Sequence, residues 1–446
     1  VLFCCVLALL GSVSVLKAEL SSEEIARLGA DLTPLGAEKA GNADGTIPAW
    51  EGGITSPPAG YEPGMHHPDP FASDAVLFTI TADNMAEYAD KLTPGYKAVL
   101  EAYPSFKMNV YPSRRSASYP QRIYDKTKEI AATARTVENG YGVEGAINGI
   151  PFPIPKSGVE AIWNHLLRFR GGIASRTIAQ AAPTRGGNYT LVQFEDEFFL
   201  LYSMEGKTEA DLNNRILFFK QEVTAPARLA GGILLVHETM NQVKEHRSAW
   251  LYNPGQRRVR RAPNVAYDNP GTAADGMRTS DQFDMFNGAV DRYDWELVGK
   301  KEMYVPYNSY KLHSDKIKVK DILTPLHTNP DYNRYELHRV WVVEGRLKED
   351  AKHVYSRRVF YVDEDSWQIG VSESYDMEGK LWRVAEAHAL NYYTVPVQLA
   401  TLYVYHDLKQ RRYIAEGIDN LRPPYRFLTT ADPREFSPNS LLYYVR

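Results

Sequence analysis

The pattern of hydrophobic and polar positions divides this chain into a helical part and a strand-rich part. A helical stripe begins at Ser157, where Ser157 and Glu160 form a capping-box pattern ahead of an apolar face. A second helical stretch covers residues 84–103 and is interrupted at Pro94. From about residue 189 to residue 390 apolar and polar positions alternate, as they do in strands with two different faces. We therefore predict helices that cover a sheet.

The alternating region predicts a large antiparallel sheet. Residues 355–362, 367–375 and 381–390 are strands joined by tight turns, so they can only pair antiparallel. Roughly nine strands exceed what a twisted sheet holds flat, so strong curvature or a half-barrel is expected. The predicted fold class is mainly β with α, a strongly curved antiparallel sheet covered by helices. The remaining predicted strands are 189–204, 214–223, 232–239, 247–253, 256–261, 301–312 and 335–343.

The first 75 residues lack this periodicity. Residues 1–16 form an apolar run that contains Cys4 and Cys5, and the chain turns polar at Glu19. The run is too short to span a membrane, so we predict a signal peptide cleaved near Ala18 and a soluble periplasmic protein; a buried N-terminal helix is the alternative. Neither cysteine ends the apolar core, so no lipid anchor is expected. The predicted divisions are 1–18, the signal peptide; 19–75, an irregular Gly/Pro-rich arm; 76–185, a helical and loop covering segment; 186–392, the curved sheet; and 393–446, a C-terminal segment packing on the same domain.

The composition narrows the class of partner. The chain has 51 basic and 55 acidic residues and a formal net charge of −4, so nucleic acid is not expected as a partner. Its 29 tyrosines, against 16 phenylalanines and 7 tryptophans, suit strands with one hydrated face or the wall of a cavity for an amphipathic ligand.

The sequence carries no recognised catalytic signature. It lacks a Gly-x-Ser-x-Gly elbow, a Walker loop and a His-Glu-x-x-His motif. Glu160 and His165 share a predicted helix, but five residues correspond to about 140° of rotation, so their side chains diverge. We therefore predict no enzyme and no cofactor. A hydrolase that assembles His237, His338 or Asp284 from distant strands is the less favoured alternative.

Two polar clusters resemble metal sites but are better interpreted otherwise. The acidic stretch 281–294 spaces its carboxylates by three, whereas a calcium loop needs alternate positions, and Arg278 and Arg292 are close enough to neutralise it. We interpret it as a structural turn network. His66 and His67 lie in a proline-rich segment and are interpreted as a solvated loop. No metal site is predicted.

Positive charge gathers on a predicted hairpin. Residues 253–256, Asn-Pro-Gly-Gln, form a turn between two strands, and four arginines follow the turn. Alternation places two of them, Arg258 and Arg260, on one face of the strand. The guanidinium groups can hold the carboxylates of the Asp281 region, which is the favoured interpretation, or recognise an acidic head group. The residues of this candidate site are Arg257, Arg258, Arg260, Arg261, Asp281 and Asp284.

At this hairpin the sequence resembles a known bacterial family. Residues 250–263, Trp-Leu-Tyr-Asn-Pro-Gly-Gln-Arg-Arg-Val-Arg-Arg-Ala-Pro, and residues 278–284, Arg-Thr-Ser-Asp-Gln-Phe-Asp, are similar to the family called domain of unknown function 1329. Residues 45–50, 149–156 and 295–301 extend the resemblance over nearly the whole chain. A fainter similarity links the tryptophan, the basic hairpin and the Ser-Asp segment to outer-membrane lipoprotein-sorting proteins of the LolA/LolB type.

The resemblance implies a periplasmic carrier whose curved sheet, closed by helices, shelters acyl chains. We therefore predict a monomeric carrier or binding protein for a lipid or other hydrophobic compound, acting with an outer-membrane barrel or an inner-membrane exporter. The Gly/Pro-rich arm supports an alternative, a structural adaptor that docks on such a partner and carries nothing. The candidate ligand-lining residues, each of which can equally be packed core, are Trp250, Tyr252, Trp295, Tyr304, Trp341, Tyr361, Trp367 and Trp382.

Overall fold

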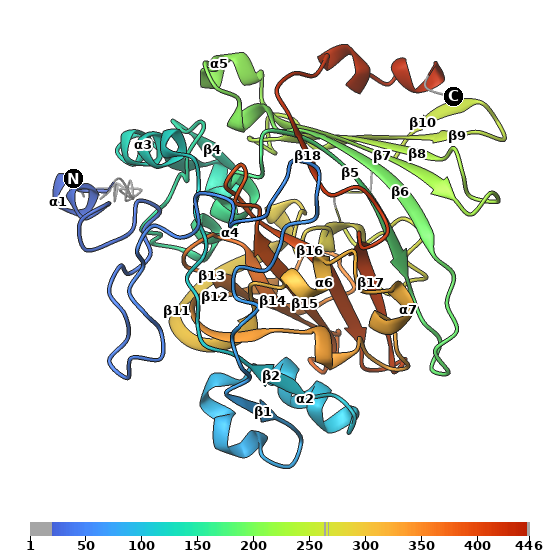
Figure 1. Ribbon diagram of the computed structural model, residues 1–446. Coiled ribbons are helices and arrows are strands. Elements are labelled where there is room, and N and C mark those ends of the chain that lie inside the picture. The colour runs from blue at the N-terminus through green and yellow to red at the C-terminus, as the bar shows by residue number, and fades with distance from the viewer. Residues whose placement is uncertain (1–19, 263–264, 266, 444–446) are drawn as a thin grey trace, which may run out of the picture.

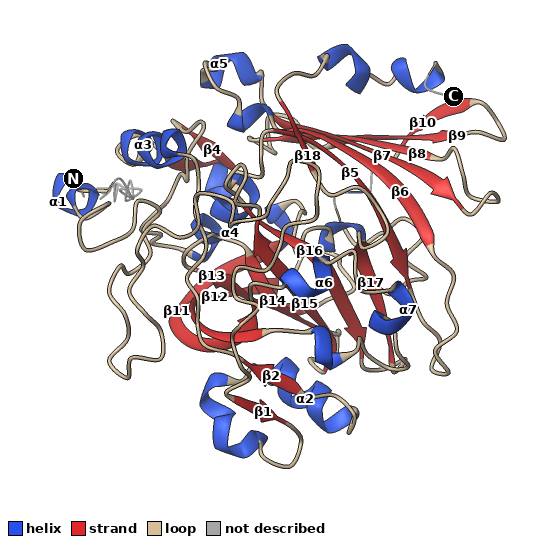
Figure 2. Cartoon of the chain, in the orientation of Figure 1, coloured by secondary structure: helices blue, strands red, loops and turns tan. Residues whose placement is uncertain are grey.

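The computed structural model describes residues 20–262, 265 and 267–443, so the predicted signal peptide and its cleavage point lie outside the described residues. Strands dominate, and short helices connect or cover them (Figure 2). The strands are β1 (Phe78–Ile80), β2 (Met108–Val110), β3 (Arg135–Val137), β4 (Gly142–Glu144), β5 (Ile173–Ala181), β6 (Val192–Phe199), β7 (Arg215–Ala225), β8 (Ile233–Thr239), β9 (Ser248–Asn253), β10 (Arg258–Arg261), β11 (Tyr293–Pro306), β12 (Tyr335–Leu347), β13 (Arg357–Asp363), β14 (Ile369–Tyr375), β15 (Leu381–Asn391), β16 (Gln398–Asp407), β17 (Arg412–Ile418) and β18 (Arg426–Leu428). The α-helices are α1 (Ser22–Ala26), α2 (Pro94–Ala102), α3 (Gln121–Ile130), α4 (Gly158–Leu167), α5 (Glu209–Leu212), α6 (Tyr310–His313) and α7 (Val319–Ile322).

One large sheet, open rather than closed into a barrel, organises the molecule (Figure 1). Its order is β1-β2-β12-β13-β14-β15-β16-β17-β5-β6-β7-β8-β9-β10, with β11 beside β12 and β18 beside β5. The predicted meander, which is β13 to β15, is confirmed, and its pairs are antiparallel. The sheet as a whole is mixed, because β2 lies parallel to β12. The predicted class, a large curved sheet with few helices, is confirmed.

The sheet is larger than the predicted range 186–392. β5 comes from the segment that we predicted to cover the sheet, and β16 to β18 come from the predicted C-terminal segment. β16 is buried along its whole length, so its sequence lacks the alternation that identifies a half-exposed strand. β11 begins at Tyr293, earlier than the predicted strand at 301–312, and residues 310–313 form α6.

Two regions of the sheet differ in how they are covered. The central strands, β12 to β17, pack beneath helices and loops, and β14 and β16 are buried at every position. The strands β6 to β10, which we call the wing, fan away from them (Figure 1). The outer face of the wing is covered by residues Pro433–Phe436 and Ser440–Leu442, through contacts of Phe436 and Leu441. The inner face of the wing turns toward the main core.

Helix α4 packs against β11 and β12. The hydroxyl of Ser157 caps it by accepting a hydrogen bond from the backbone N–H of Glu160, as predicted, while the Glu160 carboxylate accepts from the N–H of Lys156 at 2.5 Å. Trp163 is fully buried and donates to the carbonyl of Gly140 at 2.9 Å. Gly158 allows close approach to β11, since a Cβ there would lie 2.7 Å from the backbone of Glu296. The prediction that this helix covers the sheet is confirmed.

The predicted arm is irregular apart from α1. Ser21 and Glu24 form a capping box at the N-terminus of this helix. The arm runs over the surface and contacts residues far away in sequence (Figure 1). The carbonyl of Leu35, for example, accepts the indole N–H of the buried Trp367 at 3.1 Å. No helix among the described residues combines the length and the apolar character needed to cross a membrane.

Candidate functional site

Residues 267–292, which we call the strap, lie against the inner side of the sheet and are fastened there by buried charges. Asp284 accepts hydrogen bonds from Arg168 at 2.7 Å, from Arg170 at 3.1 Å and from the hydroxyl of Tyr403 at 2.8 Å. Burial alone would raise the pKa of Asp284, but the guanidinium group of Arg168 holds this pKa well below its usual range. The ionised carboxylate therefore ties the strap to the end of α4 and to β16.

A second carboxylate fastens the strap to β13. Asp281 pairs with Arg358 at 2.7 Å and with His353 at 3.1 Å, and all three side chains are buried. Burial opposes ionisation of Asp281, yet Arg358 lowers its pKa well below the usual range. In a third pair the charges are reversed, because the strap supplies the cation: Arg278 pairs with Glu416 of β17 at 2.6 Å. The acidic stretch is thus a structural network, although its cationic partners come from the end of α4 and from β13 rather than from the neighbouring arginines that we predicted.

A narrow groove separates the strap from the inner face of the wing. Its walls carry apolar side chains at alternate positions of β7 and β8, together with Phe198 of β6 and Phe283 of the strap. Its open volume is about 50 Å³. Phe219 and Phe283 close it with ring centroids 5.0 Å apart. The lining residues of the wing are Phe198, Leu217, Phe219, Gln221, Leu234, Val236 and Glu238.

The groove leads to a larger cavity of about 480 Å³, and Glu238 and Arg247 line both spaces. Arg247 pairs with Glu238 at 2.6 Å and donates to the carbonyl of Val265 at 3.0 Å. The other arginines that line the groove, Arg170 and Arg278, also have carboxylate partners. Each positive charge that lines the groove is therefore compensated, and the groove itself suits an apolar group. The larger cavity is also lined by the exposed Arg261, which forms no ion pair among the described residues.

The basic hairpin lies apart from these ion pairs. The four arginines are exposed, and none forms an ion pair with a carboxylate of the described residues. Arg260 donates to the side chain of Gln256 at 3.0 Å, and the guanidinium group of Arg261 lies 5.8 Å from the ring centroid of Trp250. The favoured interpretation, that these arginines hold Asp281 and Asp284, is wrong because Arg358 and Arg168 occupy those carboxylates.

The eight candidate aromatic residues do not meet at one cavity. Trp250 and Tyr252 belong to the cluster on the outer face of the wing. Tyr304 and Tyr361 belong to the cluster around α2. Trp295, Trp341 and Trp367 share the main core, Trp382 packs on Tyr355, and none of the eight lines the groove or the cavity beside it. Indole N–H groups of three tryptophans donate to protein oxygens: Trp295 to the Val290 carbonyl, Trp367 to the Leu35 carbonyl and Trp382 to Asp407, whereas Trp341 stacks on Trp367.

The residues of the hydrolase alternative also lie apart. His237 is on the outer face of β8, where its Nε2 atom lies 2.7 Å from the Phe436 carbonyl. His338 is buried beside Glu336, with 3.0 Å between Nε2 and the carboxylate. Asp284 is held by the two arginines of the strap network. The structure brings none of these three side chains together.

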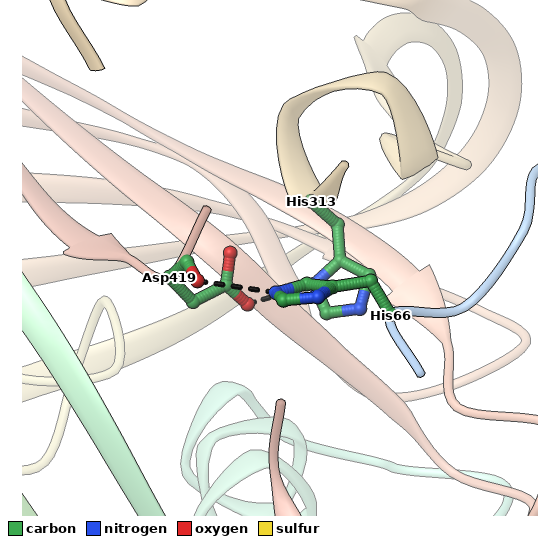
Figure 3. A group of neighbouring side chains, drawn as sticks. All are labelled: His66, His313 and Asp419. Carbon is green, nitrogen blue, oxygen red and sulfur yellow. Dashed lines mark hydrogen bonds and ion pairs between the residues drawn. The ribbon is translucent and has the colours of Figure 1, made fainter. Parts of the chain in front are cut away.

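His66 and His67 differ most from their sequence interpretation as a solvated loop. His67 is buried, and burial lowers its pKa to about 3. His66 meets His313 of α6 and Asp419, which follows β17 (Figure 3). One ligand atom from each of these three residues lies within 4.8 Å of the others. A second such group, His338 with Asp363 and Asp365, is completely buried.

Sequence reasoning missed the side chains that shape the groove. Leu234 and Val236 lie in a strand that was predicted correctly, at alternate positions that identify one face. Alternation separates the two faces of a strand, but it does not tell which one turns inward. The large aromatic residues, which the sequence favours as a ligand-lining set, pack mostly in the core.

The fold and the groove define an α+β protein built on an open, curved sheet with a strap across its inner side. The chain belongs to the protein family of unknown function DUF1329, whose model matches residues 79–442. It is 51% identical over 438 residues to an uncharacterized protein of Pseudomonas aeruginosa, covering 98% of this chain and 96% of that protein.

Solved structures show weaker likeness. A DUF1329 family protein from Desulfovibrio piger has 14% sequence identity and a TM-score of 0.43, and the match covers 63% of this chain and 95% of that one. A LolA superfamily protein from Nitrosomonas europaea has 12% identity and a TM-score of 0.38, over 64% of this chain and all of that one.

Proposed function

We propose that this protein is a carrier for a lipid or another hydrophobic compound. The ligand binds between the inner face of the wing and the strap. The observation that carries the proposal is the groove, where side chains from alternate positions of neighbouring strands present one apolar wall. Apolar surface buried there contributes about 25 cal/mol per Å², so an acyl or polycyclic ligand needs no covalent chemistry to be held.

The volume of the groove sets a condition on binding. About 50 Å³ is far below the roughly 300–1,000 Å³ of ordinary ligand pockets. The cavity beside it, of about 480 Å³, lies within that range. A ligand that occupies both spaces must displace Phe283 and the neighbouring part of the strap from the wing. The carrier therefore needs two states, with the strap closed on the wing in this structure.

We further propose that the protein works in the periplasm as a monomer and exchanges its cargo with a membrane protein, either an outer-membrane barrel or an inner-membrane exporter. The predicted signal peptide and the envelope proteins that its sequence resembles support this location. Fractionation of the native host, followed by detection of the protein, tests it. Recovery in the cytoplasmic fraction alone would contradict it.

Ligand binding is tested directly on protein purified from its own host. Native mass spectrometry and lipid extraction should identify a bound apolar molecule, and dansyl-undecanoic acid should bind with increased fluorescence. Leu234→Trp fills the groove and should weaken this binding about tenfold or more. Met377→Trp is the matched control, because Met377 is an exposed apolar residue on the turn after β14. The proposal fails if no apolar molecule binds, or if the two variants bind the probe equally.

A structural adaptor that carries nothing is the second candidate, and the small volume of the closed groove favours it. An adaptor requires a partner and no cargo. Cross-linking in the native host should then recover an envelope protein, while lipid extraction yields nothing above a denatured control. Recovery of a stoichiometric lipid would exclude this candidate.

A further inference from the structure

The arm meets the rest of the molecule at a cluster of two imidazoles and a carboxylate. His66 belongs to the arm, His313 ends α6, and Asp419 directly follows β17 (Figure 3). The Nδ1 atom of His313 lies 2.7 Å from Oδ2 of Asp419, and Nε2 of His66 lies 3.1 Å from the carbonyl oxygen of Asp419. Three segments that are far apart in sequence thus converge on one point.

Buried atoms of this cluster are left without partners. His313 is completely buried and Asp419 is 5% exposed. Oδ2 of Asp419 accepts from the hydroxyl of Thr401 at 3.0 Å, but Oδ1 of Asp419 and Nε2 of His313 have no hydrogen-bond partner among the described residues. An unpaired oxygen on a buried carboxylate is unfavourable unless a cation or a donor satisfies it. Oδ1 of Asp419 is therefore an atom that a cation would satisfy, whereas Nε2 of His313 points away from the side of the ring that contacts Asp419.

The charge of Asp419 also lacks a permanent counter-ion. Within the part of the chain that the structure describes, no lysine or arginine forms an ion pair with it. The second His/Asp group differs in this respect, because Asp365 is paired with Arg115 at 2.7 Å and no member of that group reaches solvent. A cation would therefore complete the His66 group rather than the His338 group.

The approach to this cluster is open on the side of the arm. His66 is partly exposed and lines a cavity of about 440 Å³ between arm residues 65–74 and the segment around α6. The same cavity is lined by Asp69 and Asp315 as well as Lys311 and Lys316, so its lining combines both signs of charge. An ion can therefore reach His66 without unfolding the core.

We propose that His66, His313 and Asp419 bind one divalent transition-metal ion of the zinc type and that this ion fastens the arm to the body of the protein. Two imidazole nitrogens and one carboxylate oxygen suit zinc, cobalt or nickel better than calcium or magnesium, which prefer oxygen ligands alone. Donor atoms of a tetrahedral zinc site are about 3.3 Å apart. With Nδ1 of His313 and a carboxylate oxygen of Asp419 as ligands, the contact between the two side chains must lengthen by roughly half an ångström. The proton on Nδ1 leaves that nitrogen as the ion enters, and the neutral ring keeps its one proton on Nε2.

The site lies outside the groove and does not depend on the proposed carrier function. The test uses the full chain, stripped with a chelator, and Co²⁺ as the probe. One Co²⁺ per chain should bind and give the visible absorption of a low-coordinate nitrogen and oxygen site, and Zn²⁺ should displace it and raise the melting temperature. His66→Ala should weaken Co²⁺ binding at least tenfold and abolish the Zn²⁺-dependent rise. Because His66 is partly exposed, this variant should fold.

The matched control is His246→Ala, which removes an exposed histidine far from the cluster in sequence and should leave binding unchanged. Asp419→Asn, close in shape but uncharged, should behave like His66→Ala. In the wild type, Zn²⁺ should also protect His66 from carbethoxylation while His246 stays reactive, a result that requires no variant. The proposal is overturned if the wild type binds no Co²⁺, if His66→Ala binds it as tightly as the wild type does, or if Zn²⁺ leaves His66 fully reactive.

Discussion

The central strands and the wing belong to one sheet, yet they differ in how completely their side chains are buried. β14 and β16 are buried at every position, and the buried Asp407 of β16 pairs with Arg383 of β15. The wing keeps the alternation of a half-covered sheet, and Leu251 on β9 is 46% exposed. The central strands therefore form the scaffold, while the wing offers apolar surface that a ligand or partner can cover.

The strap contacts both regions, and it contacts each of them through a different kind of side chain. Its charged residues contact the central strands through Arg358 and Glu416, and the end of α4 through Arg168. Its apolar residue Phe283 contacts the wing through Phe219. Buried ion pairs are strict in geometry, whereas apolar contacts tolerate rearrangement. The strap is thus fixed by buried ion pairs on the scaffold side, whereas the wing side holds it through the ring contact of Phe283 and through Asn287, which donates a hydrogen bond to Glu238 at 2.9 Å.

The largest expected effect concerns the scaffold side of the strap. Asp284→Ala leaves Arg168 and Arg170 buried without their carboxylate and should lower the free energy of unfolding by about 3–5 kcal/mol. Asp432→Ala removes a fully exposed pair with Arg434 and should leave the free energy of unfolding close to that of the wild type. Urea denaturation of both variants measures the difference. Equal losses would show that the strap is not anchored by its charges.

A second prediction uses pH to probe the same junction. His165 lies in α4 with Nε2 2.9 Å from the Asp284 carbonyl and Nδ1 3.3 Å from the N–H of Ile369. Burial, with the charge of Arg168 adding to it, lowers the pKa of His165 to about 3. Between its ordinary pKa of about 6.5 and this value, only the unfolded state binds the proton, so stability falls as pH falls.

The expected loss from this histidine is about 1.4 kcal/mol per pH unit within that window. His165→Gln keeps an amide donor and an acceptor but does not titrate, so its stability should decline less than that of the wild type between about pH 6.5 and pH 4.5. Chemical denaturation at several pH values measures the two slopes. Parallel slopes would mean that His165 does not couple pH to the scaffold.

The wing side of the strap is tested by locking it. Phe219→Cys with Phe283→Cys, in a chain whose Cys4 and Cys5 are replaced by serine, places two thiols across the groove. A short bis-methanethiosulfonate linker should hold the groove closed and weaken binding of dansyl-undecanoic acid about tenfold or more. Cleavage of the linker's disulfide bonds with a reductant should restore this binding. The unlinked double variant is the control. Unchanged binding after linking would show that the ligand does not enter between strap and wing.

The sequence predicts the alternating strands well, since β7, β8 and β9 appear near their predicted positions. It does not predict β16, whose two faces are both buried, or β5, which lies in the segment predicted to cover the sheet. It also does not identify the partners of Asp284 and Asp281. Arg168 and Arg358 are 116 and 77 residues away from them, and only the folded topology brings such residues together.

The smallest expected effect on stability concerns the basic hairpin, which ends the wing. β10 is an edge strand, and exposed arginines on an edge discourage pairing with another chain. Because these arginines have no carboxylate partner among the described residues, Arg258→Ala with Arg260→Ala should change the free energy of unfolding by less than about 1 kcal/mol.

We expect the same double variant to lose binding where the hairpin meets an acidic head group or partner. Sedimentation with phosphatidylglycerol vesicles measures this, and Lys318→Ala with Lys320→Ala removes the same charge from an exposed site on another element. A larger loss for the hairpin variant would place recognition at the edge of the wing, next to the groove. Equal losses would show that vesicle binding depends only on net charge. The arginines would then serve only to protect the edge strand. In that case the hairpin variant should self-associate more than the wild type does.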